Sequence, residues 1–139
     1  MKMASDQEHP EILYSDKWVT LHSDGTLIIY KYSFPTASPR TLQVARILSI
    51  STGTALNLRW WELKVWGILP TWIYWTLDGN RLELQRQGKM DEIRRRSVVI
   101  KTDEGFFHNI GLTCENVERF LQEAEKMGVD VITEPAKRK

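Results

Sequence analysis

The stretch "LTCENVERFLQEAEKMG", residues 112–128, decides the fold because it leads out of an apolar strand-like run into an amphipathic helix. Thr113 is a candidate N-cap, and Gly128 is a natural stop at the position after the last helical turn. The spacing therefore predicts a helix over about residues 114–127, with one apolar face to cover. The apolar residues at helical spacing are Val117, Phe120, Leu121, Ala124 and Met127.

Upstream of this helix the pattern is that of short strands separated by turns. "KWVTLH", "SDGT" and "LIIYKYSF" (residues 17–34) predict a hairpin in which Gly25 takes a positive φ. Five further segments have the β-branched and aromatic content typical of strands, giving roughly seven strands in all. These segments are "RTLQVARILSIS", "NLRWWELKV", "WIYWTL", "SVVIKT" and "FFHNIGL".

The length of 139 residues and the uniform composition predict one domain. We expect a flexible acidic leader over residues 1–11, the domain itself over 12–132 and a polar basic tail over 133–139. Many short strands followed by one helix favour an α+β, mainly β class. The expected architecture is a seven-stranded antiparallel barrel or split sandwich, closed by the C-terminal helix.

The order of these segments resembles the pleckstrin-homology (PH) superfold and is similar to the compact bacterial-type PH-like domain families. The resemblance spans most of residues 17–128 and implies a PH-like binding domain. Phosphoinositide-binding members grip phosphates with basic residues of the first hairpin; here Lys17 and Lys31 flank that hairpin, while Ser33 stands where an arginine is needed. The matching pieces are "SDGTLIIYKYSFP", "RTLQVARILSIS", "LKVWGI", "WTLDGNR", "SVVIKTDEG" and "IGLTCENVERFLQEAEKMG".

Composition and charge exclude several classes of protein. A net charge of +1 argues against a dedicated nucleic-acid-binding protein, which needs a concentrated excess of Lys and Arg. The single cysteine, Cys114, excludes an intramolecular disulfide and a cysteine-based metal cluster. The N-terminal residues show no secretory or transit pattern, so we expect a cytoplasmic location.

Five of the six tryptophans fall in "LRWWELKVWGILPTWIYW", residues 58–75. The uncharged window from Val65 to Leu77 contains Gly67 and Pro70 and is shorter than the about 20 apolar residues that a membrane-spanning helix needs. We therefore expect most of these indoles to fill the core.

Exposed aromatic contacts are the alternative for part of the cluster. If residues 58–65 form a strand, the adjacent Trp60 and Trp61 point to opposite faces, and at least one is partly exposed. Trp72 and Tyr74 raise the same question on the next strand, opposite Ile73 and Trp75. Trp60, Trp61, Trp72 and Tyr74 are thus the aromatic contact candidates.

Arg94, Arg95 and Arg96 form the densest basic cluster, and with Lys17 and Lys31 they are the candidates for an anion or lipid site. On a strand, Arg94 and Arg96 would share one face. Two interpretations stay open: a solvated strand start with local ion pairs, or a contact with an acidic membrane surface.

The sequence offers no pattern for catalysis. The three histidines have no ligand spacing with Asp, Glu or Cys, and no phosphate-binding glycine loop occurs. We therefore predict a protein that is not an enzyme and has no metal or cofactor. Cys114 is expected to be a small buried residue.

Three functions stay open on this evidence. The first is a non-catalytic adaptor that docks a protein partner, by adding a strand at a sheet edge or along the helix groove. The second is a module peripheral to a membrane, in which the basic candidates meet anionic headgroups and an exposed Trp enters the interface. The third is a small binder of apolar ligands with a tryptophan-lined cavity.

Overall fold

The computed structural model describes residues 10–33, 36–63, 66–67, 73–105 and 108–134. These residues form nine strands in two sheets, together with helices that follow or interrupt the strands. The chain is therefore mixed α and β and mainly built on sheets, as the sequence predicts. The strands are β1 (Ile12–Ser15), β2 (Val19–His22), β3 (Thr26–Ile29), β4 (Arg40–Gln43), β5 (Ile47–Thr52), β6 (Tyr74–Trp75), β7 (Ser97–Thr102), β8 (Asn109–Thr113) and β9 (Val131–Ile132).

The first sheet is an antiparallel meander in the order β1-β2-β3-β4. The predicted hairpin is confirmed: β2 and β3 pair with Val19 opposite Ile29, and Gly25 in the turn has a φ of 90°. Glycine suits this position because it lacks the Cβ that disfavours positive φ. A bulge in β1 between Ile12 and Tyr14 shifts its register against β2.

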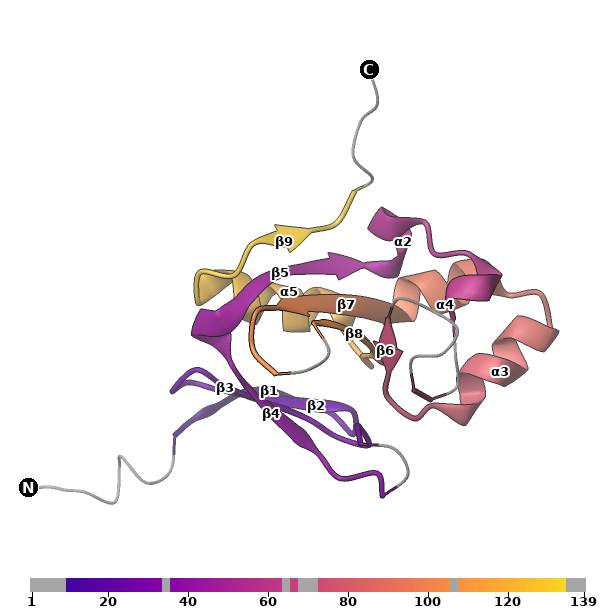
Figure 1. Cartoon of the computed structure of the whole chain (residues 1–139). Helices are drawn as coiled ribbons and strands as arrows, with labels where there is room; N and C mark the ends of the chain where they lie inside the picture. The colour runs from indigo at the N-terminus through magenta and orange to yellow at the C-terminus, as the bar shows by residue number, and fades with distance from the viewer. Residues whose placement is uncertain (1–9, 34–35, 64–65, 68–72, 106–107, 135–139) are drawn as a thin grey trace, which may run out of the picture.

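The second sheet has the order β6-β8-β7-β5-β9 and mixes pairing directions (Figure 1). β5, β7 and β8 are antiparallel neighbours, whereas β6 pairs with β8 and β9 pairs with β5 in parallel. The two sheets do not close into a barrel, so the barrel form of the expected barrel or split sandwich is not confirmed, and two parallel pairs depart from the expected antiparallel pairing. The described residues form nine strands where roughly seven were expected: β1 and β9 are additional, η1 (Val44–Arg46) divides one expected strand into β4 and β5, and η2 (Trp60–Glu62) lies in a segment expected to be a strand.

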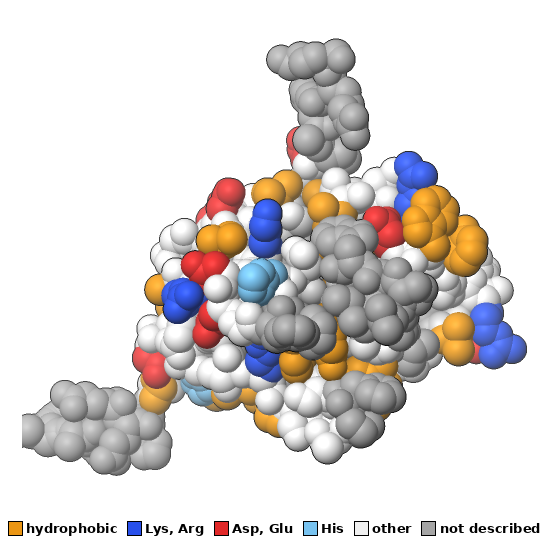
Figure 2. Space-filling model, in the orientation of Figure 1, with side chains coloured by type: hydrophobic (Ala, Val, Ile, Leu, Met, Phe, Trp, Pro, Cys, Tyr) orange, Lys and Arg blue, Asp and Glu red, His pale blue; other side chains and the backbone are white. Residues whose placement is uncertain are grey.

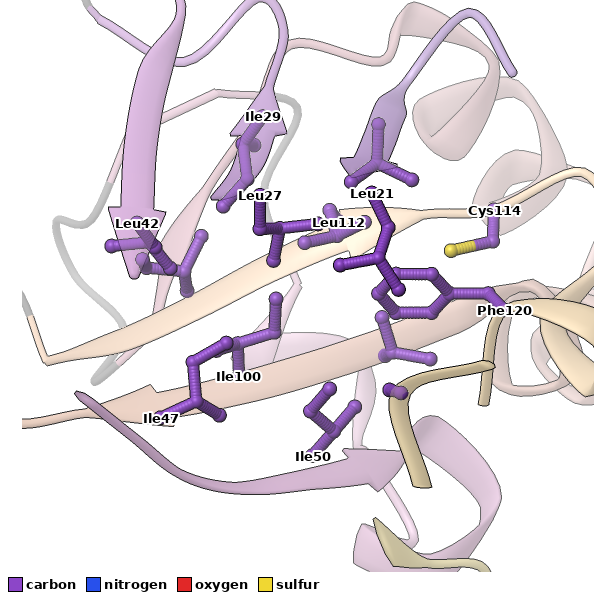
Figure 3. Close-up of a cluster of buried hydrophobic side chains, with 14 of the residues drawn as sticks. Leu21, Leu27, Ile29, Leu42, Ile47, Ile50, Ile100, Leu112, Cys114 and Phe120 are labelled. Carbon is purple, nitrogen blue, oxygen red and sulfur yellow. The ribbon is translucent and has the colours of Figure 1, made fainter. Parts of the chain in front are cut away.

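The main core lies between the two sheets and is closed by helix α5 (Val117–Lys126). Leu21 and Leu27 of the first sheet face Ile100 and Leu112 of the second, and Phe120 of α5 packs beside them (Figure 3). All five side chains are at most 1% exposed. Burial of a side chain of this size stabilises the fold by about 1.5–3 kcal/mol, so this layer accounts for much of the stability.

Helix α5 confirms the predicted C-terminal helix, with one correction at its start. Thr113 belongs to β8, and the N-cap is Asn116, whose side chain accepts a hydrogen bond from the backbone N–H of Arg119. The helix thus begins after the expected boundary of residue 114. Gly128, with a φ of 95°, follows the last turn as predicted.

A second, smaller core lies on the other side of β7, beneath three helices. Residues 81–96, for which the sequence analysis predicts no helix, lie mostly in α3 and α4, and β7 begins directly after them. Asp78 caps α3 through a hydrogen bond from the N–H of Asn80. The helices are α2 (Gly53–Leu56), α3 (Gly79–Arg86) and α4 (Met90–Arg96), and the 3-10 turns are η1 (Val44–Arg46) and η2 (Trp60–Glu62). The buried residues of this second core are Leu58, Leu63, Ile73, Trp75, Ile93 and Val99.

Candidate functional site

The most exposed aromatic side chains of the described chain belong to the 3-10 turn η2. Trp60 is 64% exposed and Trp61 is 52% exposed. The expected strand with opposite faces is wrong here: both indoles lie on a helical turn, and both reach solvent. The prediction that the tryptophan cluster is mostly core therefore fails for this pair. It holds for Trp75, which is fully buried.

The turn projects from the surface because its two flanks are anchored in the second core. Leu58 and Leu63 are buried, with exposed fractions of 0% and 7%, and they bracket the exposed residues between them. Because Leu58 and Leu63 fix both ends of this short turn in the core, the indoles of Trp60 and Trp61 point toward solvent. A contiguous exposed apolar patch can mark an interaction site, which makes this adjacent pair of indoles a candidate contact.

Hydrogen bonds from three other elements hold the backbone of this turn. The indole N–H of Trp75 donates to the carbonyl oxygen of Glu62 at 2.8 Å, and the side-chain amide of Gln85 donates to the carbonyl oxygen of Trp60 at 2.9 Å. Arg94 donates through Nε to the carbonyl oxygen of Leu58 at 2.8 Å. Strand β6 and helices α3 and α4 therefore fix a turn that itself has little regular structure.

The two indoles also order each other. Their rings lie 5.7 Å apart, centroid to centroid, at an interplanar angle of 88°, which is a favoured edge-to-face arrangement. The guanidinium of Arg59 lies 5.3 Å from the ring centre of Trp61. We call Arg59, Trp60 and Trp61 the aromatic patch. Figure 2 shows a hydrophobic cluster beside a basic side chain on the helical side of the molecule, where η2 lies.

A buried polar cluster packs against Trp75, the residue whose indole N–H bonds to the turn of the patch. Arg81 is 2% exposed, and its guanidinium lies 4.5 Å from the ring centre of Trp75. It donates to the carbonyl oxygen of Thr76 at 3.0 Å, while the hydroxyl of Thr113 donates to Asp78 at 2.7 Å. Burial lowers the pKa of Arg81 to about 10, an effect that the nearby Asp78 opposes, so the side chain stays charged at neutral pH and holds Trp75 in place.

The second pair of aromatic candidates has a different outcome. Tyr74 is buried in β6, and its ring stacks on Tyr32 at a centroid distance of 4.4 Å, so its expected exposure is wrong. The cause is the parallel pairing of β6 with β8, which places this residue against the main core. Trp72 lies outside the described residues.

The arginine cluster lies in the last turn of α4 and not on a strand. Arg94 pairs with Asp91 at 2.9 Å, and Arg95 pairs with Glu92. Arg96 lies 3.9 Å from Glu92 as well. The positive charge of the last turn of α4 is therefore largely neutralised by Asp91 and Glu92 of its first turn. This agrees with the interpretation that the arginines form local ion pairs.

Lys17 and Lys31, in contrast, come together. Their ammonium nitrogens lie 5.0 and 5.2 Å from the ring centre of Trp18, whose side chain is 6% exposed. Among the described residues, neither lysine forms an ion pair. The nearby Asp16 carboxylate already accepts hydrogen bonds from the backbone N–H groups of Trp18 and Glu115. Two cations thus share one indole at the end of the β2–β3 hairpin.

The other features considered from the sequence are Cys114, a metal site and a membrane-spanning helix. Cys114 is buried, as predicted, and burial raises the pKa of its thiol. Within the described ranges, no group of three or more His, Cys, Asp or Glu side chains could hold a metal ion. In the same part of the chain, no helix has the length and apolar character needed to cross a bilayer.

Comparison with known proteins adds no relative: no family model, curated protein or solved structure matches the chain. The candidate site therefore depends on its geometry alone. The sequence pointed to Trp60 and Trp61 but missed the residues that position them, namely Gln85, Arg94 and Arg81. The missed signal is the pair of helices in residues 79–96, which brings Gln85 and Arg94 to the turn and Arg81 to the ring of Trp75.

Proposed function

We propose that this chain is a non-catalytic, PH-like binding module that docks a protein partner through the aromatic patch. The single observation that carries the proposal is the exposure of Trp60 and Trp61 on a turn that three other elements hold in place. The order of elements supports the PH-like part, since a four-stranded meander precedes a second sheet and a terminal helix. A cytoplasmic setting stays a prediction.

The composition of the patch favours a protein partner. Trp and Arg are the residues most enriched among interface hot spots, where a few side chains carry most of the binding free energy. Arg59 stacks against Trp61, so its planar guanidinium is presented next to an apolar surface. A partner that supplies an apolar pocket with a carboxylate at its rim would match both groups.

The rigidity of the turn also favours binding. Ordering a mobile side chain at an interface costs about 0.5–1.5 kcal/mol. Here the carbonyl oxygens of Trp60 and Glu62 are already held by side chains from α3 and β6, and the two rings are packed on each other. Much of this ordering cost is therefore already included in the free energy of the folded chain before a partner binds.

The test compares capture by three forms of the full chain at equal concentration. The wild type, the double variant Trp60→Ala/Trp61→Ala and the control Leu48→Ala are immobilised, and bound proteins are quantified by mass spectrometry. Leu48 is a suitable control because it is 49% exposed and belongs to β5, outside the patch. A partner captured by the wild type and the control but at least about tenfold reduced with the double variant is expected, because hot-spot loss exceeds 1.4 kcal/mol. Equal capture by all three forms would remove the proposal.

A second candidate function has its own observation, the convergence of Lys17 and Lys31 on Trp18. Each basic residue near an anionic surface contributes about 1 kcal/mol. Sedimentation with vesicles that contain or lack phosphatidylserine tests this contact at low salt. The variant Lys17→Ala/Lys31→Ala should lose binding, whereas Arg95→Ala should retain it because Arg95 is paired with Glu92. Absence of wild-type binding at low salt would exclude the membrane function.

A further inference from the structure

The pairing of β7 with β8 brings two helix ends together at one end of the second sheet. Ser97, the first residue of β7, pairs with Thr113, the last residue of β8. Directly beyond this pair, the backbone N–H of Cys114 donates to the carbonyl oxygen of Arg96 at 2.9 Å. The end of α4, which leads into β7, therefore lies beside the segment that leads from β8 into α5 (Figure 1).

A cleft of about 640 Å³ opens where these two helix ends meet the end of β5. Four charged side chains line it. The last turn of α4 contributes Arg95 and Arg96, the first turn of α5 contributes Glu118, and Glu115 lies just before that helix. We call this hollow the charged cleft.

The two arginines on the α4 side share one counter-ion. Arg95 pairs with Glu92, and Arg96 lies 3.9 Å from the same carboxylate, at the limit of an ion pair. Two guanidinium groups share one carboxylate, so this side of the cleft keeps an excess of one positive charge. Arg96 is the less compensated of the two, because Glu92 is held more closely by Arg95.

The α5 side of the cleft is acidic. Glu115 and Glu118 are exposed, and in the part of the chain that the structure describes neither takes part in an ion pair. They do not pair with the arginines, although all four side chains line the same cleft. Opposite charges thus face one cleft without meeting, so a ligand that carries both a carboxylate and an ammonium group is complementary to both sides.

Apolar side chains of α5 add a third feature to the cleft. Leu121 is buried and Val117 is half-buried, and both line the cleft while packing with the main core. A methylene chain can pack on such a surface while its charged end stays in water. A ligand with two opposite charges at the ends of a methylene chain therefore matches the charged and the apolar parts of the lining together.

We propose that the charged cleft binds the carboxylate and the side-chain ammonium of a lysine, either as the free amino acid or as the last residue of a protein chain. Arg96 binds the carboxylate, because its planar guanidinium matches carboxylate geometry. Glu115 and Glu118 bind the ammonium, and the methylene chain packs on Val117. The cleft belongs to α4 and α5, so it is separate from the aromatic patch on η2.

NMR titration of the isotopically labelled full chain with 6-aminohexanoate tests the charge arrangement. This probe has a carboxylate and an ammonium at the two ends of a methylene chain. At constant ionic strength it should cause saturable shifts of the amides of Arg96, Val117 and Glu118. Hexanoate and hexylamine carry one charge each, and each should bind about two- to fivefold more weakly, as expected for loss of one exposed charge pair.

Two variants should change these affinities in opposite ways. Glu118→Gln should weaken hexylamine about two- to fivefold and spare hexanoate, whereas Arg96→Gln should weaken hexanoate and spare hexylamine. Both should weaken 6-aminohexanoate. Glu125→Gln, on α5 but outside the cleft, should leave all three affinities at the wild-type values. The three probes with the wild type and Glu118→Gln decide the result even if Arg96→Gln does not fold.

Peptides distinguish a free lysine from the end of a protein chain. A short Gly-Ser peptide that ends in lysine with a free carboxylate should bind, and the same peptide with an amidated C-terminus should bind about two- to fivefold more weakly. Tighter binding of free lysine than of the peptide assigns the cleft to the amino acid, and the reverse order assigns it to a chain end. Either order supports a lysine site.

Two results would overturn the inference. One is equal affinity of the chain for 6-aminohexanoate, hexanoate and hexylamine. The other is the lack of saturable shifts around the charged cleft at about 50 mM 6-aminohexanoate, where a site with a Kd of about 1 mM is nearly filled. Neither result bears on the aromatic patch, whose capture experiment changes other residues.

Discussion

The indole N–H of the buried Trp75 donates to the backbone carbonyl of Glu62 at 2.8 Å, and this bond connects the second core to the exposed aromatic patch. The ring of Trp75 lies between the guanidinium of Arg81, 4.5 Å from the ring centre, and Gly111 of β8. The orientation of the patch is therefore set by packing inside the domain, and changes to the core should reach the surface through Trp75.

Replacement of Trp75 by Phe should loosen the patch. The phenyl ring keeps most of the buried area but removes the indole N–H that donates to the Glu62 carbonyl oxygen, and loss of this hydrogen bond should lower the free energy of unfolding by about 0.5–1.5 kcal/mol. Amide hydrogen exchange at Trp61, Glu62 and Leu63 should become faster. Trp18→Phe serves as the control, since it removes another buried indole that lies away from η2. Unchanged exchange in Trp75→Phe would show that the bond does not order the turn.

Gly111→Ala should destabilise the fold through the same tryptophan. A Cβ at this position would lie 2.5 Å from the Trp75 ring, so the ring or the strand must shift. Overpacking of this kind costs about 1–3 kcal/mol in chemical denaturation. Gly79→Ala is the matched control, because nothing lies within 4 Å of its Cβ at the start of α3. A stability equal to that of the wild type would mean that the core around Trp75 is looser than described.

Tyr14 should make the fold sensitive to alkaline pH. Burial, together with the hydrogen bond to Asp16, raises the pKa of the Tyr14 hydroxyl above the ordinary value of 10.0. The group binds its proton more tightly in the folded chain, so its stabilising contribution is complete below pH 10 and falls as the pH rises further. Urea unfolding at a series of alkaline pH values should show this loss, and Tyr14→Phe should reduce the slope. A Tyr14 phenol that ionises in the native protein like a free tyrosine would contradict the assignment.

Cys114 should react slowly with thiol reagents while the domain is folded. The side chain is buried against the main core, and burial raises the pKa of its thiol, so little thiolate is accessible at neutral pH. Reaction with a chromogenic disulfide should be at least about a hundredfold faster after unfolding in denaturant. Rapid modification of the native chain would indicate that the start of α5 opens readily.

The parts of the fold that the sequence predicted well are those fixed by local signals. The β2–β3 hairpin has a glycine in its turn, β7 coincides with "SVVIKT", and α5 ends two residues before Gly128. In each case the residues that define the element lie within a few positions of one another. Local propensity and the final structure agree there.

The parts that were missed depend on contacts between distant residues. The sequence of residues 58–65 alternates like a strand, but residues 60–62 form η2, and the flanking Leu58 and Leu63 are buried in the second core together with Ile93. The parallel pairing of β9 with β5 joins residues far apart in the chain. Helices α3 and α4 had local signals in the Asp78 cap and in Gly88, whose φ is 75°, but their charged composition hid any apolar stripe.

The central claim, that the aromatic patch is a docking surface, is tested most directly by photo-crosslinking in the cell. A photoreactive amino acid is placed at position 61 of the full chain, and at position 48 as the exposed control. The account predicts one reproducible protein crosslinked from position 61, attached through a single segment of that protein, absent from position 48 and lost when Trp60→Ala is added. The same crosslinked proteins from both positions, or none from position 61, would contradict the claim.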